Sequence, residues 1–360
     1  MAILVFIIIL VILVLIHEFG HFIAAKKNGV MVEEFGFGFP PRIFGIKKGE
    51  TLYSVNLIPL GGFVKLYGEE YHEADSDSVK GTEIEYRNRA FVYKKPWQKG
   101  LIVIAGIIGN FILGWVLISF LFTQGIPSPT DKVIVENVQA NSPAQKAGLN
   151  PNDIIEKVKV GSKTVSLKSS NDLISLTKRY GDLPITLIVQ RGSREFSTSI
   201  TPRKNPPSGQ GPLGIVITSF IEKKYPWYQA PFYGLLEAFN ITKTIVIELS
   251  KTVVKLASLQ KPSAEVAGPI GIAQYTGQAI KFGKNAVLEL IALLSLNLAV
   301  INILPFPALD GGRLVFVVYE WITKRRVNKV IERYTNLVGI IILLTLAVVI
   351  SINDIIRLYR

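Results

Sequence analysis

The chain has 360 residues, of which 49% are hydrophobic, and a formal net charge of +13 at pH 7. Its mean hydropathy of +0.36 is high for a soluble protein, and the length leaves room for two or three modules. Because the chain contains no cysteine, disulfides and thiolate metal sites are excluded, so any bound metal must use His, Asp, Glu or water.

Four blocks approach the roughly 20 apolar residues needed to cross a hydrocarbon core, at residues 3–25, 101–123, 286–306 and 335–353. We therefore expect a polytopic α-helical membrane protein with four transmembrane helices. The first block could instead be a cleaved signal peptide. It lacks a basic n-region, however, and its apolar run is too long for an h-region, so we interpret it as a membrane anchor.

Basic residues cluster beside these blocks. Lysines flank the first two blocks, at Lys26, Lys27, Lys94, Lys95 and Lys99. Six basic residues lie between the last two blocks, at Arg313, Lys324, Arg325, Arg326, Lys329 and Arg333. The positive-inside rule places both groups in the cytoplasm and the large middle region outside, although Arg357 and Arg360 weakly favour the reverse. The sequence contains no stripe of interleaved basic and aromatic residues, so we do not expect a nucleic-acid partner.

The first block contains the sequence HEFGH at residues 17–21. On a helix, His17 and His21 share one face and can bind one zinc ion, while the adjacent Glu18 can act as general base on water. This pattern also arises by chance in soluble proteins. Inside an apolar span, however, His and Glu destabilise insertion, and such a cluster is by default a functional-site hypothesis.

Two short strands are predicted after the first block. Glycines and prolines at residues 33–42 predict a tight turn. Residues 51–67 then alternate around Pro59, Leu60, Gly61 and Gly62, which predicts a hairpin over 52–67. A surface hairpin of a soluble domain is one interpretation. Its apolar strands favour a hairpin that packs against the membrane beside the first helix.

The second block carries Gly106, Gly109, Asn110 and Gly114, which predicts a face for close helix packing, with Asn110 able to bond to a neighbour. Residues 126–204 lose membrane character and predict a small β-rich domain. Residues 205–285 predict a linker followed by an external or interfacial amphipathic helix over about 229–260.

A catalytic zinc site normally has three protein ligands and one open position. The third histidine, His72, lies in an acidic stretch and is expected to be a bystander. Asp310 is the leading third ligand, because it ends an apolar block at a depth similar to that of the two histidines; its alternative is a helix cap. Asn297 and Asn302 could either bond to a neighbouring helix or orient an extended substrate backbone.

Five stretches together resemble one known family. In order they are HEFGH, PLGGFVKLYGE, AGIIGNF, a β-rich insert and NILPFPALDGG. The chain resembles the site-2 protease family of intramembrane zinc metalloproteases, and most of all its bacterial regulator-of-sigma-E protease branch. In the insert, NSPAQKAGLNPNDII resembles PDZ domains, with Asn152 where glycine is usual. The insert resembles a single PDZ domain, whereas some family members have two.

The resemblance implies a role for each motif. His17, His21 and Asp310 match the zinc ligands, and Glu18 matches the catalytic glutamate. Asn302, and more weakly Asn297, match residues that hold the substrate. The predicted hairpin, with Gly61, Gly62 and Phe63, matches a membrane-reentrant element that presents the substrate as an added strand.

The expected function is therefore hydrolysis of peptide bonds within single-span membrane proteins, such as anti-sigma factors or signal-peptide remnants. The expected location is the bacterial plasma membrane, with the active site towards the cytoplasm and the PDZ-like domain, which binds peptide or protein segments, outside. Two alternatives are a non-catalytic PDZ scaffold and a zinc hydrolase of a non-peptide substrate. We expect four modules. Residues 1–125 hold two transmembrane helices and the hairpin, and residues 126–204 form the PDZ-like domain. Residues 205–285 form the linker and the amphipathic helix, and residues 286–360 hold the last two transmembrane helices.

Overall fold

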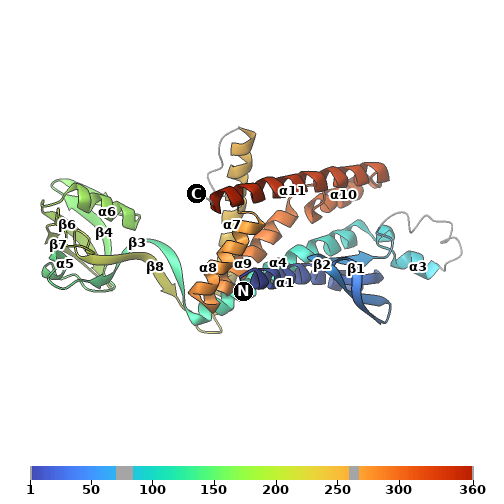
Figure 1. The fold of residues 1–360 in the computed structure, drawn as a ribbon, viewed down its shortest axis with the longest axis horizontal. Helices are drawn as coiled ribbons and strands as arrows, with labels where there is room; N and C mark the ends of the chain where they lie inside the picture. Colours follow the sequence, from blue (N-terminus) through green and yellow to red (C-terminus); the bar gives the residue numbers. More distant parts are fainter. Residues whose placement is uncertain (1, 70–83, 259–266, 359–360) are drawn as a thin grey trace. The chain divides into compact units, whose positions relative to one another are not determined.

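The computed structural model describes residues 2–69, 84–258 and 267–358 (Figure 1). His72 lies outside the described residues. The chain divides into two compact units. Residues 1–123 and 226–360 form one, which we call the membrane unit, and residues 124–225 form the other, the inserted unit.

Among the described residues, four helices of the membrane unit are long and apolar enough to cross a membrane, which confirms the number expected. They are α1 (Ala2–Lys27), α4 (Pro96–Gln124), α9 (Lys284–Ile303) and α11 (Lys329–Leu358). The same unit contains α3 (Ile84–Arg89), the 3-10 turn η2 (Phe91–Tyr93), α7 (Ala230–Ala257), α8 (Pro269–Phe282) and α10 (Asp310–Thr323). The helix expected over 229–260 is α7, whereas α8 was not predicted.

Helix α1 packs closely against two other helices. Ile9 and Leu13 are buried and pack with Ile291 of α9. Further along α1, a Cβ at Gly109 of α4 would lie 2.9 Å from the carbonyl oxygen of Ile16. The glycine therefore brings the backbones of α1 and α4 together, as small residues do in membrane helix pairs.

The outer helix α11 exposes most of its apolar side chains. Only 6% of its most hydrophobic stretch is buried inside the protein, and Leu344 is 62% exposed. A hydrocarbon environment removes the cost of exposing such a surface to water. The exposure is therefore that of a helix surrounded by lipid.

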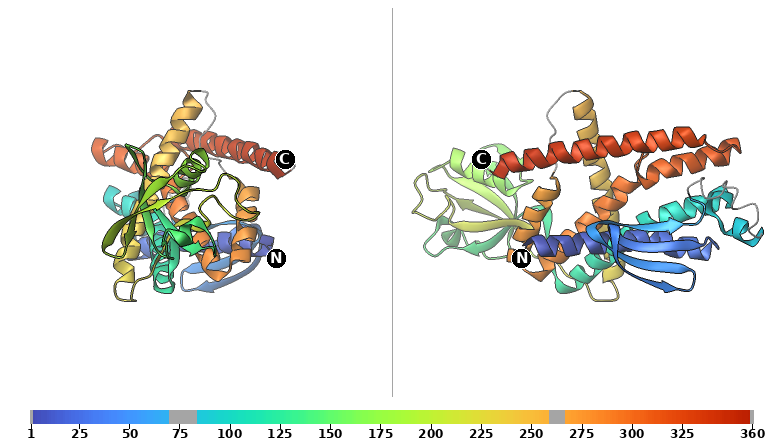
Figure 2. Two further views of the ribbon diagram at one scale, coloured as in Figure 1. Left: turned by 90° about the vertical axis from the view of Figure 1, so that its left-hand side faces the viewer. Right: turned by 45° about the vertical axis from the view of Figure 1, so that its right-hand side comes forward.

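A small β-sheet lies beside α1 as expected, but the hairpin predicted over 52–67 is not formed as such. Strands β1 (Val32–Lys48) and β2 (Thr51–Leu66) pair with each other beside α1 (Figure 2). The chain reverses at residues 49–50. All of residues 33–42 belong to β1, but the partners of β1 in β2 rise to Ile58 at Phe39 and fall from Asn56 at Arg42 onwards, so the chain also reverses within the predicted turn.

The two halves of β2 do not pair with each other as a hairpin over 52–67 would require. Phe35 of β1 is paired with both Tyr53 and Val64, so β1 lies between the two halves. One glycine of the first predicted turn makes room inside the sheet. A Cβ at Gly36 would lie 2.8 Å from the Ser54 hydroxyl oxygen.

The inserted unit is a β-rich domain. Its sheet has the order β7-β6-β4-β3-β8, with β5 paired to β4. The strands are β3 (Ile126–Val138), β4 (Ile154–Val160), β5 (Lys163–Ser166), β6 (Ile185–Arg191), β7 (Arg194–Ile200) and β8 (Ile215–Lys223), and the helices are α5 (Pro143–Lys146) and α6 (Ser170–Arg179). Its core contains Val133, Ile155 and Leu187, which alternate with less buried neighbours as strand residues do.

The sequence placed the end of this domain too early. Strand β8 lies in the stretch expected to be a linker, yet it pairs with β3 from Ile126 to Val138. Residues 205–212 are therefore a loop within the inserted unit. The physical reason is that β8 completes the sheet at its edge, and such pairing between residues far apart in the sequence leaves no local signal.

Candidate metal centre

The two histidines of the HEFGH sequence lie one turn apart on α1. Their ring planes are nearly perpendicular, at 84°, and their centroids are 4.7 Å apart. The Nε2 atoms of His17 and His21 are 3.2 Å apart. Both rings therefore direct the same nitrogen to one point, as the spacing of four residues on a helix predicts.

Asp310 reaches this point from the start of α10. Helix α9 ends at Ile303, and the chain turns through residues 304–309 before α10 begins. Gly311 and Gly312 lie against the carbonyl groups of the preceding turn, so that a Cβ at Gly312 would lie 2.9 Å from the carbonyl carbon of Phe306. The two glycines therefore let α10 fold back on the end of α9 and direct Asp310 towards α1.

The carboxylate completes a cluster of three candidate metal ligands. Oδ2 of Asp310 lies 2.9 Å from Nε2 of His17 and 3.3 Å from Nε2 of His21. In a tetrahedral zinc site with bonds of about 2.0–2.1 Å, neighbouring ligand atoms are about 3.3 Å apart. The spacing of the three ligand atoms therefore suits zinc. The three side chains are only 12–15% exposed.

The electron pairs of these atoms face one another. Nδ1 of His21 lies 2.8 Å from the carbonyl oxygen of Ile102, which can only accept a hydrogen bond. The proton of His21 therefore lies on Nδ1, and Nε2 presents a lone pair. Among the residues that the structure describes, Oδ2 of Asp310 is buried without a hydrogen-bond partner. Such a group of acceptors fits a cation.

Glu18 lies beside the cluster and next to β2. A Cβ at Gly62 would lie 3.2 Å from Cγ of Glu18 and 2.9 Å from Cγ1 of Val14. The absence of a side chain at Gly62 therefore lets β2 approach α1 at the position of the glutamate. The neighbouring Gly61 has a positive φ of 96°, and the ring of Phe63 lies against Gly36 of β1.

The two asparagines of α9 differ in their distance from the cluster. Nδ2 of Asn302 lies 3.5 Å from Nε2 of His17. Asn297 is half-buried, and within the described part of the chain it makes no hydrogen bond to the candidate ligands. The structure therefore brings Asn302 to the centre but not Asn297.

Helix α4 contributes two residues whose role in the centre was not predicted. The ring of His21 occupies the space that a side chain at Gly106 would need. Nδ2 of Asn110 lies 3.4 Å from Nδ1 of His17. The available signal was Asn110 itself, since a buried polar group in a transmembrane helix usually has a partner.

A cavity of about 990 Å³ with a mixed apolar and charged lining lies in the membrane unit along α10, whose first residue is Asp310. Its lining includes Glu69, Lys99, Arg313 and Glu320. Nη1 of Arg313, one turn after Asp310, forms an ion pair with Oε1 of Glu69 at 2.5 Å. Charged side chains of this cavity therefore lie on the same helix as Asp310.

Comparisons with known proteins show what the whole chain is similar to. The family model described as peptidase family M50 matches residues 5–346. The putative zinc metalloprotease CPE1693 of Clostridium perfringens is 35% identical, covering 96% of this chain and 95% of its own. The regulator of sigma-W protease RasP of Bacillus subtilis is 30% identical, covering 98% of both chains. The crystal structure of the PDZ domain of an SdrC-like protein from Listeria monocytogenes is 20% identical, with a TM-score of 0.22, covering 26% of this chain and 94% of that one.

The chain therefore belongs to peptidase family M50, the site-2 protease family of zinc metalloproteases. It is a multi-pass membrane enzyme that uses zinc. Membership of a family of proteases excludes the non-catalytic scaffold and the hydrolase of a non-peptide substrate as its main function.

Proposed function

We propose that His17, His21 and Asp310 hold the zinc ion and that Glu18 is the general base of peptide hydrolysis. The observation that carries this proposal is the convergence of the three ligand atoms beside Glu18. A zinc ion held there supplies Lewis acidity, which polarises the scissile carbonyl and lowers the pKa of a coordinated water molecule. Glu18 accepts a proton from the attacking water and passes it to the leaving amine.

We propose that the substrate lies as an extended strand between β2 and α9. In the described register, residues 62–65 of β2 pair with β1 along one edge, and a substrate backbone can add to the other. Gly61, Gly62 and Phe63 contact it there, the Asn302 amide holds its backbone, and Asn297 acts further along α9. A transmembrane helix must unwind locally to bind in this way, because its peptide groups are bonded to one another.

The substrate class that follows is single-span membrane proteins, including anti-sigma factors and signal-peptide remnants. The test is cleavage of a model single-span substrate by the full chain in liposomes, with Glu18→Gln as the variant. We expect cleavage to fall by a factor of about 10²–10⁴, while bound zinc is retained. Undiminished cleavage by Glu18→Gln rejects Glu18 as the base.

A further proposal concerns orientation in the bacterial plasma membrane. We propose that the end of α1, the start of α4 and the α10–α11 connection lie in the cytoplasm and the inserted unit outside, because basic residues gather in those three segments. Because the chain has no cysteine, single cysteines give an unambiguous label. We expect an impermeant maleimide to label Ser162→Cys but not Lys324→Cys in cells from which the outer barrier is removed; the reverse pattern contradicts this orientation.

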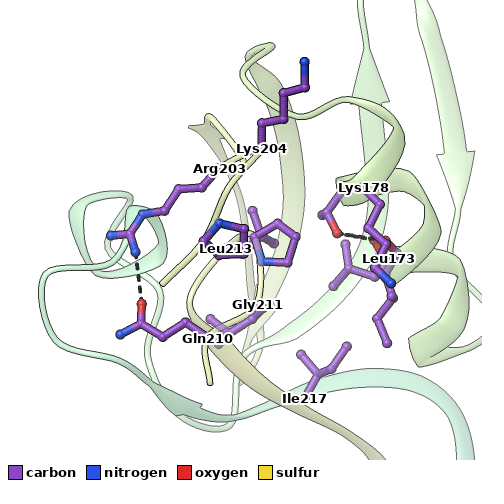
Figure 3. A pocket seen from close by; sticks show the side chains of 13 residues that line it. Leu173, Lys178, Arg203, Lys204, Gln210, Gly211, Leu213 and Ile217 are labelled. Carbon is purple, nitrogen blue, oxygen red and sulfur yellow. Dashed lines mark hydrogen bonds between the residues drawn. The ribbon is translucent and has the colours of Figure 1, made fainter. Parts of the chain in front are cut away.

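We propose that the inserted unit acts as a PDZ-like domain that binds peptide segments. A cavity of about 610 Å³ lies between α6 and β8 (Figure 3). Leu173, Leu213 and Ile217 give it an apolar lining, with Arg203 and Lys204 among its basic residues. Because β8 is an edge strand of the sheet, a peptide can pair with it and place apolar side chains in the cavity.

The peptide proposal is tested with the full chain and fluorescent peptides that carry apolar residues. We expect Leu173→Asp, which puts a charge in the apolar lining, to weaken binding by about tenfold or more. Ser175→Asp is the matched control, since Ser175 lies exposed on the same helix. Equal binding by the two variants rejects this cavity as the peptide site.

A further inference from the structure

One face of α4 contacts both histidines of the metal centre. Ile102, Gly106 and Asn110 follow at intervals of four residues, and positions so spaced share a helix face. The carbonyl of Ile102 accepts from Nδ1 of His21, Gly106 makes room for the His21 ring, and the Asn110 amide meets Nδ1 of His17. A single helix face therefore contacts the outer side of each ring.

The two histidines must present the same nitrogen to a shared metal ion. For His21 the carbonyl of Ile102 ensures this, because a proton on Nδ1 leaves a lone pair on Nε2. For His17 the partner is an amide, which has a donor and an acceptor. If Nδ2 donated to Nδ1, the proton of a neutral ring would lie on Nε2 and face Asp310, where it would block metal binding.

The Asn110 side chain has an unmet hydrogen-bond requirement that decides between these arrangements. The residue is fully buried, and Oδ1 has no hydrogen-bond partner among the described residues. Nδ2 lies 3.4 Å from Nδ1 of His17, beyond the usual range of about 2.7–3.2 Å. The oxygen and nitrogen of an amide are assigned by their hydrogen bonds. A half-turn of the amide directs Oδ1 towards Nδ1 and gives this buried acceptor a donor.

We propose that Asn110 is a positioning residue for the zinc centre. Its Oδ1 accepts a hydrogen bond from Nδ1–H of His17 and keeps Nε2 of that ring free to bind metal. The backbone carbonyl oxygen of Asn110 has a separate partner, because the hydroxyl of Ser295 of α9 donates to it at 2.7 Å without contacting the amide. Groups that orient metal-binding histidines in this way raise metal affinity.

The first test is zinc affinity of the full chain in detergent, measured by competition with a chelator. Asn110→Leu removes the acceptor at similar volume, and Asn110→Asp keeps an acceptor. Ser295→Ala is the control, because it removes a hydrogen bond to the backbone of Asn110 without touching the amide. We expect Asn110→Leu to lose about tenfold to hundredfold in zinc affinity. The zinc affinities of Asn110→Asp and Ser295→Ala should stay close to that of the wild type.

The outcomes separate the acceptor role from simple packing. Wild-type affinity in Asn110→Leu overturns the proposal. A loss of zinc affinity in both Asn110→Leu and Asn110→Asp, with Ser295→Ala unaffected, also overturns it, because the aspartate retains an acceptor. If Ser295→Ala loses zinc as well, the second test decides for or against the proposal by the position of the His17 ring proton in the wild type.

The second test reads that proton position directly. The chain has three histidines, so ring ¹⁵N shifts of selectively labelled, zinc-free protein can be assigned by replacing each in turn. At a pH where the rings are neutral, we expect the proton of His17 on Nδ1 in the wild type. In Asn110→Leu we expect a mixture of the Nδ1–H and Nε2–H tautomers of His17, with His21 unchanged. A His17 ring protonated on Nε2 in the wild type, or unaltered in the variant, rejects the proposal.

The role of Asn110 rests on the proposed function, in which His17 is a zinc ligand. A separate variant therefore tests the ligand alone. His17→Ala tests the ligand, and its full retention of zinc refutes the ligand set. If His17→Ala loses zinc while Asn110→Leu keeps it, the ligand set stands and only the role of Asn110 is refuted.

Discussion

Lys99 of α4 and Glu320 of α10 form an ion pair whose nitrogen–oxygen distance is 2.8 Å, with the lysine side chain only 5% exposed. The Nζ of Lys99 donates to both carboxylate oxygens. Because α10 begins at Asp310 and α4 contacts both histidines, this pair joins two helices that contribute to the metal centre.

Removing one partner of this pair is expected to destabilise the membrane unit. Glu320→Gln leaves the buried Lys99 ammonium without its counter-charge, which costs about 3 kcal/mol or more. The measurement is the shift in thermal unfolding of the full chain in detergent. The double variant Lys99→Met with Glu320→Leu replaces both charges with apolar groups and is expected to recover most of the loss; a double variant as unstable as Glu320→Gln contradicts the explanation.

Asp310→Ala is expected to lower zinc affinity by about a hundredfold or more, because it removes one of three protein ligands. Metal content after dialysis against a chelator measures the effect. Glu289→Gln removes an exposed carboxylate from α9 and serves as the control. Unchanged zinc content in Asp310→Ala removes Asp310 from the ligand set.

Gly62→Val is expected to reduce cleavage without reducing zinc content. Its Cβ would lie 2.9 Å from Val14 Cγ1 and 3.2 Å from Glu18 Cγ, so either β2 or Glu18 must move. A displacement of about 1 Å can lower the rate by about a hundredfold. The control is Gly49→Asn, in the turn of the same sheet, where a Cβ meets nothing within 4 Å and Asn accepts the positive φ. Wild-type cleavage by Gly62→Val shows that this contact is dispensable.

The inserted unit is expected to lose stability in acid through Asp153. Burial alone raises the pKa of this carboxyl, but the hydrogen bonds from Arg191 and from the Asn150 amide, with the charge of Arg191, lower the pKa below its ordinary 3.8. A carboxyl with a lowered pKa in the folded state stabilises that state above the unfolded pKa. This stabilisation is lost as pH falls from about 3.8 through the folded value.

The check is urea unfolding of the inserted unit within the full chain, followed by pulse proteolysis with pepsin between pH 5 and pH 2. Asp153→Asn is expected to be less stable than wild type at pH 5 and to approach it at pH 2. Glu195→Gln, at an exposed position on β7, should run parallel to wild type. A constant difference between Asp153→Asn and wild type across this range excludes the linkage.

The four apolar helices and the three candidate ligands could be predicted because each has a local cause. A span requires one continuous apolar block, and the His17–His21 pair requires only the period of a helix. Asp310 was harder, because its meeting with the histidines depends on the fold. It could be inferred from the need for a third ligand in a chain without cysteine.

The sheet and the end of the inserted unit could not be predicted correctly for a common reason. Whether Phe35 lies in a turn or between two strands depends on partners at Tyr53 and Val64, and β8 is a strand only because β3 is available to pair with it. Asn110 shows the same limit. Its residue type predicted a hydrogen bond to a neighbouring helix, but only the packing of α4 against α1 shows that the neighbour is His17.

The candidate ligands come from the first helix and from a helix near the other end of the chain, and this has a consequence for biosynthesis. Because the ribosome makes α1 first, His17 and His21 enter the membrane long before Asp310 exists. A nascent or truncated chain therefore lacks the complete ligand set, however well its first helices are inserted. With the proposed ligand set, we expect proteolytic activity to begin only after Asp310 of α10 has met His17 and His21 of α1, so that unfinished copies of the enzyme leave neighbouring membrane proteins uncleaved.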